Sequence, residues 1–278
     1  MKIYKTQLGN IIEHQGVCYL STITNWDTFI KQDDLFTFLQ NHIPQLSVVG
    51  DNTWIQQQKL EAPIGSQEVW AAGVTYLRSK QARMEESEQS GGASFYDKVY
   101  DAERPELFFK ANPQRTVGTN DYVRIRKDST WNVPEPELVL LVNSASKIVG
   151  YSIGNDMSSR SIEGENPLYL PQAKVYDKCA GLGPCILITE KPIEATTGIK
   201  IIIERGEELM YEGSTTISQM KRSHTELVEF LFRECSFANG VYLMTGTCLV
   251  PDNNFTLQNK DVIKISIDGI GELINIVE

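Results

Sequence analysis

The chain has 278 residues, 41% of them hydrophobic and 22% charged, with a formal net charge of −10 and a pI near 5.0. This size suits one large domain with a small companion and can bury a sizeable core. The acidic balance argues against a nucleic-acid partner, because phosphate backbones require basic surfaces. No apolar run approaches the roughly 20 residues of a membrane helix, so we expect no membrane partner.

Cysteine and histidine usage narrows the cellular setting and the type of metal site. The five cysteines form no C-x-x-C pair, and their odd number argues against a disulfide framework or a zinc ribbon. With only three histidines, any metal should be a hard ion bound by oxygen. The N-terminal segment lacks the apolar core of a signal peptide. We therefore expect a protein of the reducing cytoplasm.

Residues 1–64 are predicted to form a small N-terminal α+β domain. Short β-like runs alternate there with one helix-like stretch that begins at Asp27, with an apolar face that includes Leu35 and Leu39. The segment from Glu61 to Ser66 has the composition of a linker. Residues 65–278 are then expected to form the larger, catalytic domain.

The larger domain should open with a strand at residues 69–72. The polar stretch from Arg78 to Glu103, which includes Gly91 and Gly92, is predicted to be a mobile lid or a plain surface helix and loop, with a helix possible as far as Ser90.

Many short strands follow, interrupted by one clear helix. Ser223 and Glu226 form a capping-box pattern before an apolar run, which indicates a helix start. Gly181 to Pro184 has turn chemistry and lacks the lysine and the setting of a phosphate loop. Because the strands dominate without regular helices between them, the pattern favours a β-rich α+β fold over a Rossmann or TIM architecture. The strands are expected near residues 107–109, 138–142, 148–153, 185–189, 199–204, 241–244, 262–267 and 273–277.

An acidic constellation lies around the second and third of these strands. Glu135 and Glu137 are two residues apart, so on an extended backbone they face the same way. Residues 143–146 provide turn chemistry for a hairpin. If Val142 pairs near Lys147 or Ile148, an antiparallel register places Asp156 opposite about residues 133–135. The sequence therefore predicts three carboxylates at the open end of a hairpin.

Three like charges at this range raise one another's pKa unless a cation lies between them. Mg²⁺ suits two or three carboxylates and leaves positions for water and substrate. The alternative interpretation is that these acids are solvated strand ends, a reading favoured for an E-x-E pair alone. Pro134 and Pro136 place the pair at the start or edge of a strand.

These motifs resemble the fumarylacetoacetate hydrolase family, over about residues 69–277. The family's metal site is an E-x-E pair followed by an aspartate in an N-D-x-S-x-R turn, and this pattern implies Glu135, Glu137 and Asp156 as metal ligands. Its P-x-x-F-x-K element is similar to residues 105–110. Its later lysine and T-G-T loop are similar to Lys174 and residues 245–247. The resemblance therefore implies the family fold, in which mixed sheets are layered as a β-roll.

Within the family, the stretch ENPLYLPQAKVYDKCAGLGP is similar to a 2-keto-3-deoxy-D-arabinonate dehydratase group. The hydrolases carry a histidine in a Y-x-x-H pattern, whereas here Ser79 follows Tyr76 at that spacing. Without that base, water attack on a carbonyl is disfavoured. The resemblance therefore implies Mg²⁺-dependent dehydration of a 2-keto-3-deoxy sugar acid to 2,5-dioxopentanoate in pentose catabolism, with Mn²⁺ or Ca²⁺ as possible substitutes.

The resemblance also implies the roles of single residues. Lys174 and Glu106 are the candidates for the acid and the base, in either order. Arg78, Ser79 and Thr247 are candidates for binding the substrate carboxylate or hydroxyls.

Two further basic residues belong to the same motifs. Arg160 is a candidate for orienting the acids or for a structural ion pair. Lys110 could neutralise the acid cluster without a role in chemistry.

Other functions stay open at this stage. An acylpyruvate hydrolase or an oxaloacetate decarboxylase of the same family would use the same metal and a 2-oxo acid. A non-catalytic binding protein of the same fold is the alternative from another class. The resemblance also implies a homodimer or a homotetramer.

Overall fold

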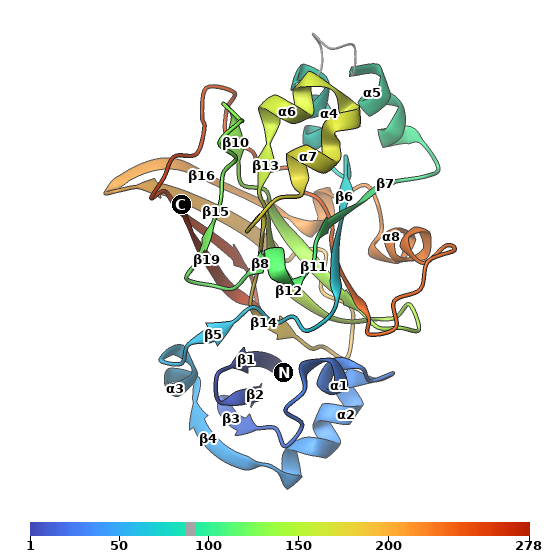
Figure 1. Cartoon of the computed structure of the whole chain (residues 1–278). Helices are drawn as coiled ribbons and strands as arrows, with labels where there is room; N and C mark the ends of the chain where they lie inside the picture. The colour runs from blue at the N-terminus through green and yellow to red at the C-terminus, as the bar shows by residue number, and fades with distance from the viewer. Residues whose placement is uncertain (87–92) are drawn as a thin grey trace.

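The computed structural model describes residues 1–86 and 93–278. The chain is built mainly of strands, with helices grouped at a few places on their outside (Figure 1). The predicted β-rich α+β fold class is confirmed. Residues 87–92, which contain the predicted Gly91–Gly92 pair, lie outside the described residues.

The largest sheet, among the described residues, runs in the order β4-β3-β2-β1-β14-β12-β11-β17-β6-β7, with β5 beside β1 and β8 beside β14. Most neighbours are antiparallel, but β17 pairs with β6 and β14 with β8 in parallel. The strands are β1 Lys2–Thr6, β2 Gly9–His14, β3 Val17–Leu20, β4 Ser47–Asp51, β5 Leu60–Glu61, β6 Glu68–Gly73, β7 Glu106–Ala111, β8 Thr116–Val117, β11 Pro136–Val142, β12 Ile148–Asp156, β14 Ala180–Leu187 and β17 Val241–Met244.

Two smaller sheets complete the strands of the described residues. A five-stranded sheet has the order β16-β15-β18-β19-β9, and a two-stranded pair joins β10 to β13. Their strands are β9 Asp121–Val123, β10 Asn132–Val133, β13 Ser158–Ser159, β15 Gly198–Arg205, β16 Glu208–Thr216, β18 Val262–Ile267 and β19 Gly271–Val277.

The N-terminal strands carry three helices, α1 Trp26–Ile30, α2 Leu35–His42 and α3 Asn52–Gln56, and lie at one end of the molecule (Figure 1). The single helix-like stretch of the sequence is thus two helices. Asp34 accepts a hydrogen bond from Thr37 N and begins α2, with Leu35 and Leu39 buried as expected. Because β1 also pairs with β14, the sheet continues across residue 64. The division into domains of residues 1–64 and 65–278 stays a prediction.

Four helices gather at the opposite end of the sheet, namely α4 Leu77–Glu86, α5 Ala93–Asp101, α6 Arg160–Glu165 and α7 Leu170–Lys174 (Figure 1). The eighth, α8 His224–Leu231, follows the predicted cap: Ser223 accepts from Glu226 N. The Glu226 carboxylate does not close the capping box, and instead accepts from Arg222 at 2.5 Å. Short 3-10 turns lie at Ile43–Gln45, Pro113–Arg115, Pro167–Tyr169 and Ile217–Gln219.

β11 lies between two hydrophobic cores, one on each face of the large sheet. Leu138, Leu140 and Val142 point into one core, while Val139 and Leu141 point into the other. A strand buried on both faces reads as a continuous apolar run, which explains the unbroken sequence of residues 138–142. This rigid central strand carries Glu137 and fixes its position.

One sequence interpretation was wrong. Residues 181–184 were expected to form a turn, but they lie within β14, where Gly181, Leu182 and Gly183 pair with β12. Gly181 is needed there for close packing, because a Cβ on it would lie 2.3 Å from the side-chain oxygen of Asn275. Glycine in this strand therefore marks a close approach of another chain segment, not a turn.

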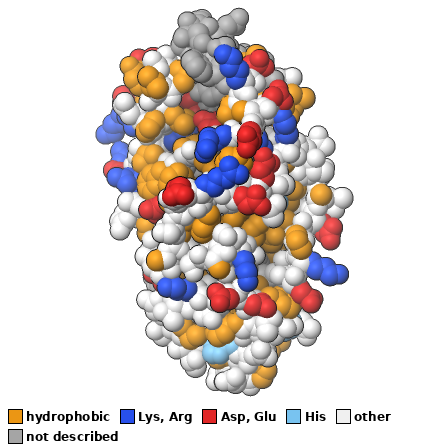
Figure 2. Space-filling model, turned by 90° about the vertical axis from the view of Figure 1, so that its right-hand side faces the viewer, with side chains coloured by type: hydrophobic (Ala, Val, Ile, Leu, Met, Phe, Trp, Pro, Cys, Tyr) orange, Lys and Arg blue, Asp and Glu red, His pale blue; other side chains and the backbone are white. Residues whose placement is uncertain are grey.

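On the face that carries α8, basic and acidic side chains lie next to one another in the middle of the view (Figure 2). Charges of both signs mixed in this way are typical of a soluble surface. In the described part of the chain, no helix is long and apolar enough to cross a membrane.

Candidate metal centre and active site

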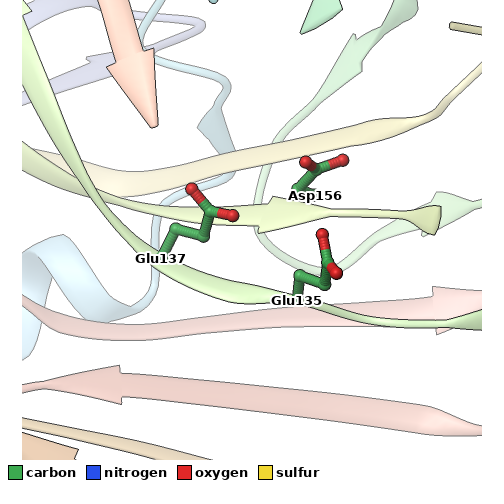
Figure 3. Close-up of side chains that lie close together, drawn as sticks. All are labelled: Glu135, Glu137 and Asp156. Atoms are coloured by element: carbon green, nitrogen blue, oxygen red, sulfur yellow. The ribbon is translucent and has the colours of Figure 1, made fainter. Parts of the chain in front are cut away.

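The β11–β12 hairpin brings three acids together. Val142 pairs with Ile148 and Pro136 with Asn155, and Asp156 N donates to Glu135 O at 2.9 Å. This is the register predicted from the turn at residues 143–146, and it is confirmed. Glu135 lies just before β11, Glu137 within it, and Asp156 at the end of β12. Their carboxyl groups point toward one another (Figure 3).

These acids are buried, which rules out the alternative of solvated strand ends. Glu135, Glu137 and Asp156 are 4%, 2% and 1% exposed. Each offers a carboxylate oxygen, and these oxygens all lie within 4.8 Å of one another. Burial raises the pKa of Glu137 well above its ordinary value, and the neighbouring Asp156 and Glu135 raise it further. The cluster therefore favours a bound cation.

Three buried basic side chains surround the acids. Lys174 Nζ donates to Glu135 Oε2, to Asp156 Oδ2 at 3.1 Å and to Ser158 Oγ at 2.6 Å. Arg160 donates to Glu135 Oε1 at 2.5 Å. Against the effect of burial, the ammonium groups of Lys110 and Lys174 hold the pKa of Asp156 below its ordinary value. Asp156 is thus kept ionised beside a Glu137 that resists ionisation.

β7 presents alternate residues to this cluster. Glu106 and Phe108 share one face, because successive side chains of a strand point to opposite sides. Lys110 lies where the register between β6 and β7 shifts, and its own contacts place it at the cluster. Phe108 lines the cavity, and its ring centroid lies 5.6 Å from Lys174 Nζ.

Lys110 Nζ contacts Asp156 Oδ1 at 2.7 Å and donates to Met157 O at 2.9 Å and Lys174 O at 2.5 Å. This ammonium therefore makes one ion pair and two hydrogen bonds with backbone carbonyl groups. Lys110 therefore neutralises Asp156, as the sequence suggested, and also ties α7 to the end of β12.

The acids face a small cavity of about 20 Å³. This volume holds one water molecule or ion, and a five-carbon acid requires its walls to move. Ser79 and Thr247 line the cavity with Arg160 and Lys174. Arg78, by contrast, is exposed on the first turn of α4.

The candidate substrate-binding hydroxyls already make local hydrogen bonds. Ser79 Oγ donates to Tyr76 O at 2.7 Å and accepts from Tyr76 N. Thr247 Oγ1 accepts from Leu249 N at 3.1 Å. Their roles toward a substrate stay predictions.

Three site residues were not singled out from the sequence. Ser158 donates to Glu135 Oε2 at 2.9 Å, Gly246 N donates to Glu137 Oε2 at 2.6 Å, and Gly73 lines the cavity. Ser158 and Gly246 belong to the N-D-x-S-x-R and T-G-T motifs, so the motifs themselves could have indicated a role for both residues. Nothing in the local sequence distinguishes Gly73.

Comparisons with known proteins agree with this geometry. A relative from Haloferax volcanii, named a probable 2-keto-3-deoxyxylonate dehydratase, is 50% identical over 217 residues, which cover 77% of this chain and 73% of the relative. A 2-dehydro-3-deoxy-D-arabinonate dehydratase from Saccharolobus solfataricus is 39% identical over 228 residues, covering 81% and 76%.

A solved structure gives the same result. It is a 2-keto-3-deoxy-D-arabinonate dehydratase complexed with magnesium and 2,5-dioxopentanoate, with a TM-score of 0.82, 31% identity and coverage of 100% and 99%. A sequence model described as fumarylacetoacetate (FAA) hydrolase C-terminal matches residues 69–278. The chain belongs to the fumarylacetoacetate hydrolase family.

Proposed function

We propose that this protein is a metal-dependent dehydratase that converts 2-keto-3-deoxy-D-arabinonate to 2,5-dioxopentanoate. The observation that carries the proposal is the buried set of Glu135, Glu137 and Asp156 with Lys174 Nζ hydrogen-bonded among them. Two relatives with dehydratase names support it, because both names refer to five-carbon 2-keto-3-deoxy acids.

The residues present fit a divalent metal. Glu135, Glu137 and Asp156 are hard oxygen donors, and ionisation of Glu137 is disfavoured first by burial and then by its acidic neighbours. A divalent cation held by these three residues would remove that penalty. When bound, it would act as a Lewis acid toward the keto oxygen of a 2-oxo acid and so acidify the C3 protons.

Lys174 and Glu106 carry the proton transfers in this proposal. One takes a proton from C3, the other donates a proton to the hydroxyl group that leaves C4 as water, and tautomerisation then gives the C5 aldehyde. Lys174 Nζ is held within the site by Ser158 and two of the carboxylates. Glu106 lies on the same face of β7 as Phe108, which lines the cavity.

Side chains at the cavity wall are proposed to bind the substrate. Ser79 and Thr247 offer hydroxyls there, and Arg160 offers a guanidinium group beside Glu135. Arg78 is the candidate for the outer part of the acid, because it is exposed at the start of α4. Ser79 cannot replace the histidine of the hydrolases as a general base, since a neutral hydroxyl does not accept a proton near pH 7.

The proposal includes Mg²⁺ as the metal, with Mn²⁺ or Ca²⁺ as substitutes. Three carboxylates match the preferences of these ions. It also includes a homodimer or homotetramer in a reducing cytoplasm. The free thiols of all five cysteines support the compartment.

The experiment is an activity comparison on protein stripped of metal by EDTA and then supplied with Mg²⁺. The substrates are 2-keto-3-deoxy-D-arabinonate, its L enantiomer and oxaloacetate. We expect 2,5-dioxopentanoate only after Mg²⁺ is restored, detected by NMR. Glu135→Gln should abolish this product, whereas Glu229→Gln, at an exposed position on α8, should not. Pyruvate from oxaloacetate without any 2,5-dioxopentanoate would overturn the proposal.

A further inference from the structure

Gly73 lies beside the candidate acid–base residue. β6 and β7 are antiparallel neighbours, and their register pairs Gly73 with Glu106. Gly73 also lines the cavity that contains the three carboxylates and Lys174. Gly73 is therefore both the strand partner of Glu106 and part of the wall of the proposed reaction site.

A side chain at Gly73 would occupy the space of the Glu106 carboxylate. A Cβ on Gly73 would lie 1.9 Å from Glu106 Oε2 and 2.6 Å from its Cδ. Non-bonded carbon atoms approach favourably only to about 3.5 Å. Glu106 Oε2 is also shielded from solvent. The carboxylate thus lies across the backbone of β6 and not in open water.

The backbone after Gly73 cannot easily move to make room. Val74 has a φ of +53°, in the left-handed region that a β-branched residue rarely adopts. Thr75 Oγ1 donates to Thr245 O at 2.7 Å and holds this turn against the loop after β17. A strained conformation persists only where the surrounding structure fixes it. A larger residue at position 73 would therefore displace Glu106 before it displaced β6.

We propose that Gly73 is a positioning residue for the dehydration. Because it has no side chain, the Glu106 carboxylate can cross β6 toward Lys174 and the metal ligands. This inference rests on the proposed function, and specifically on Glu106 as a proton-transfer group. A glycine needed only for packing would affect stability but would act independently of the Glu106 carboxylate.

The test is a double-mutant cycle with Gly73→Ala, Glu106→Gln and both together, assayed with Mg²⁺ and 2-keto-3-deoxy-D-arabinonate. We expect kcat to fall at least 100-fold in each single variant. In the double variant kcat should stay within about threefold of Glu106→Gln, because the two changes remove the same interaction. Mg²⁺ affinity, measured by calorimetry, should stay within threefold throughout. Losses that multiply would overturn the inference.

Two variants separate this effect from a general folding defect. In Gly73→Ala/Glu106→Ala the clashing side chain is gone, so its melting temperature should match that of Glu106→Ala. A double variant as destabilised as Gly73→Ala alone would contradict the proposed contact. Gly198→Ala is the matched control. Gly198 begins β15 of the five-stranded sheet, away from the cavity, and a Cβ on it would lie 2.7 Å from a carboxylate oxygen, Asp268 Oδ2. It should leave kcat unchanged.

A crystal structure of Gly73→Ala gives a readout without turnover. The Glu106 carboxylate should leave its place on β6, and an unchanged carboxylate would overturn the inference. If the unmodified enzyme forms no 2,5-dioxopentanoate, the proposed function fails. The crystallographic and melting comparisons then still decide whether Gly73 positions Glu106.

Discussion

Glu137→Gln is expected to stabilise the metal-free protein and to prevent its stabilisation by Mg²⁺. The substitution replaces a buried carboxylate by a neutral group of nearly the same shape. Its amide oxygen can still accept the hydrogen bond that Gly246 N donates to Glu137 at 2.6 Å. The change therefore removes the cost of burying this charge and its electrostatic repulsion by Asp156 and Glu135.

The size of the effect follows from the spacing of the acids. Their ligand oxygens lie within 4.8 Å of one another. Two unit charges at that separation interact by about 3 kcal/mol at an effective dielectric constant near 20. Glu137 is repelled by two carboxylates and attracted by Lys174. The electrostatic repulsion alone should therefore contribute a gain of about 3 kcal/mol in the free energy of unfolding at a pH where Glu137 is ionised.

This gain should depend on pH in a defined direction. The pKa of Glu137 in the folded protein is raised above its ordinary value of 4.5. The folded state thus binds a proton more tightly, and its stability falls as pH rises from about 4.5 through the raised pKa. Glu137→Gln lacks this loss, so the difference between the two proteins should grow toward pH 8.

The assay is urea unfolding followed by tryptophan fluorescence, from pH 5 to pH 8, in EDTA and in Mg²⁺. Mg²⁺ at 100 times its dissociation constant should stabilise the unmodified protein by about 2.7 kcal/mol and the variant by much less. Glu229→Gln, on the exposed side of α8, should show neither effect. A Glu137→Gln protein that is less stable than the unmodified one in EDTA at pH 8 would refute the reasoning.

Three further substitutions test other parts of the site. Lys110→Met should lower the free energy of unfolding by about 3 to 5 kcal/mol, because it removes a buried ammonium group that contacts Asp156 at 2.7 Å and leaves this carboxylate with Lys174 alone. A loss below about 1 kcal/mol in urea unfolding would contradict this. Lys174→Met should lower kcat for 2,5-dioxopentanoate formation by roughly 10² to 10⁴, and a smaller effect would remove Lys174 from the proton transfers. Ser79→Ala should lower the free energy of unfolding by about 1 kcal/mol, because the Ser79 hydroxyl makes two hydrogen bonds with the Tyr76 backbone. An unchanged melting temperature would argue against that contact.

The acid cluster could be predicted because its information is local. Alternating side chains place Glu135 and Glu137 on one face, and the turn at residues 143–146 sets the register that returns Asp156 to them. The continuous apolar run of β11 also indicated a deeply buried strand. Hairpins of this kind are specified by sequence positions that lie close together.

The cation contacts could not be predicted from the sequence, because they join distant segments. Lys110 donates to Lys174 O across 64 positions of the chain. A lysine at position 110 indicated that it could neutralise an acid. It did not indicate that its partners would be Asp156 and two backbone carbonyl groups. Gly73 was missed for the same reason, since its role depends on the side chain of a strand that begins 33 positions later.

Short helices and glycine-rich strands also could not be predicted from local sequence patterns. α6 and α7 have six and five residues, too few for a clear helical period. Residues 181–184 have the composition of a turn, yet they pack inside β14 because Asn275 approaches Gly181 closely. Tertiary packing outweighed local preference at both places.

A crystal structure of the protein soaked in Mn²⁺, with anomalous scattering recorded, tests the metal site most directly. We predict one ion bound by carboxylate oxygens of Glu135, Glu137 and Asp156, with Lys174 Nζ moved away from at least one of them. Anomalous density elsewhere only, with Lys174 still bonded to Glu135 and Asp156, would contradict the account.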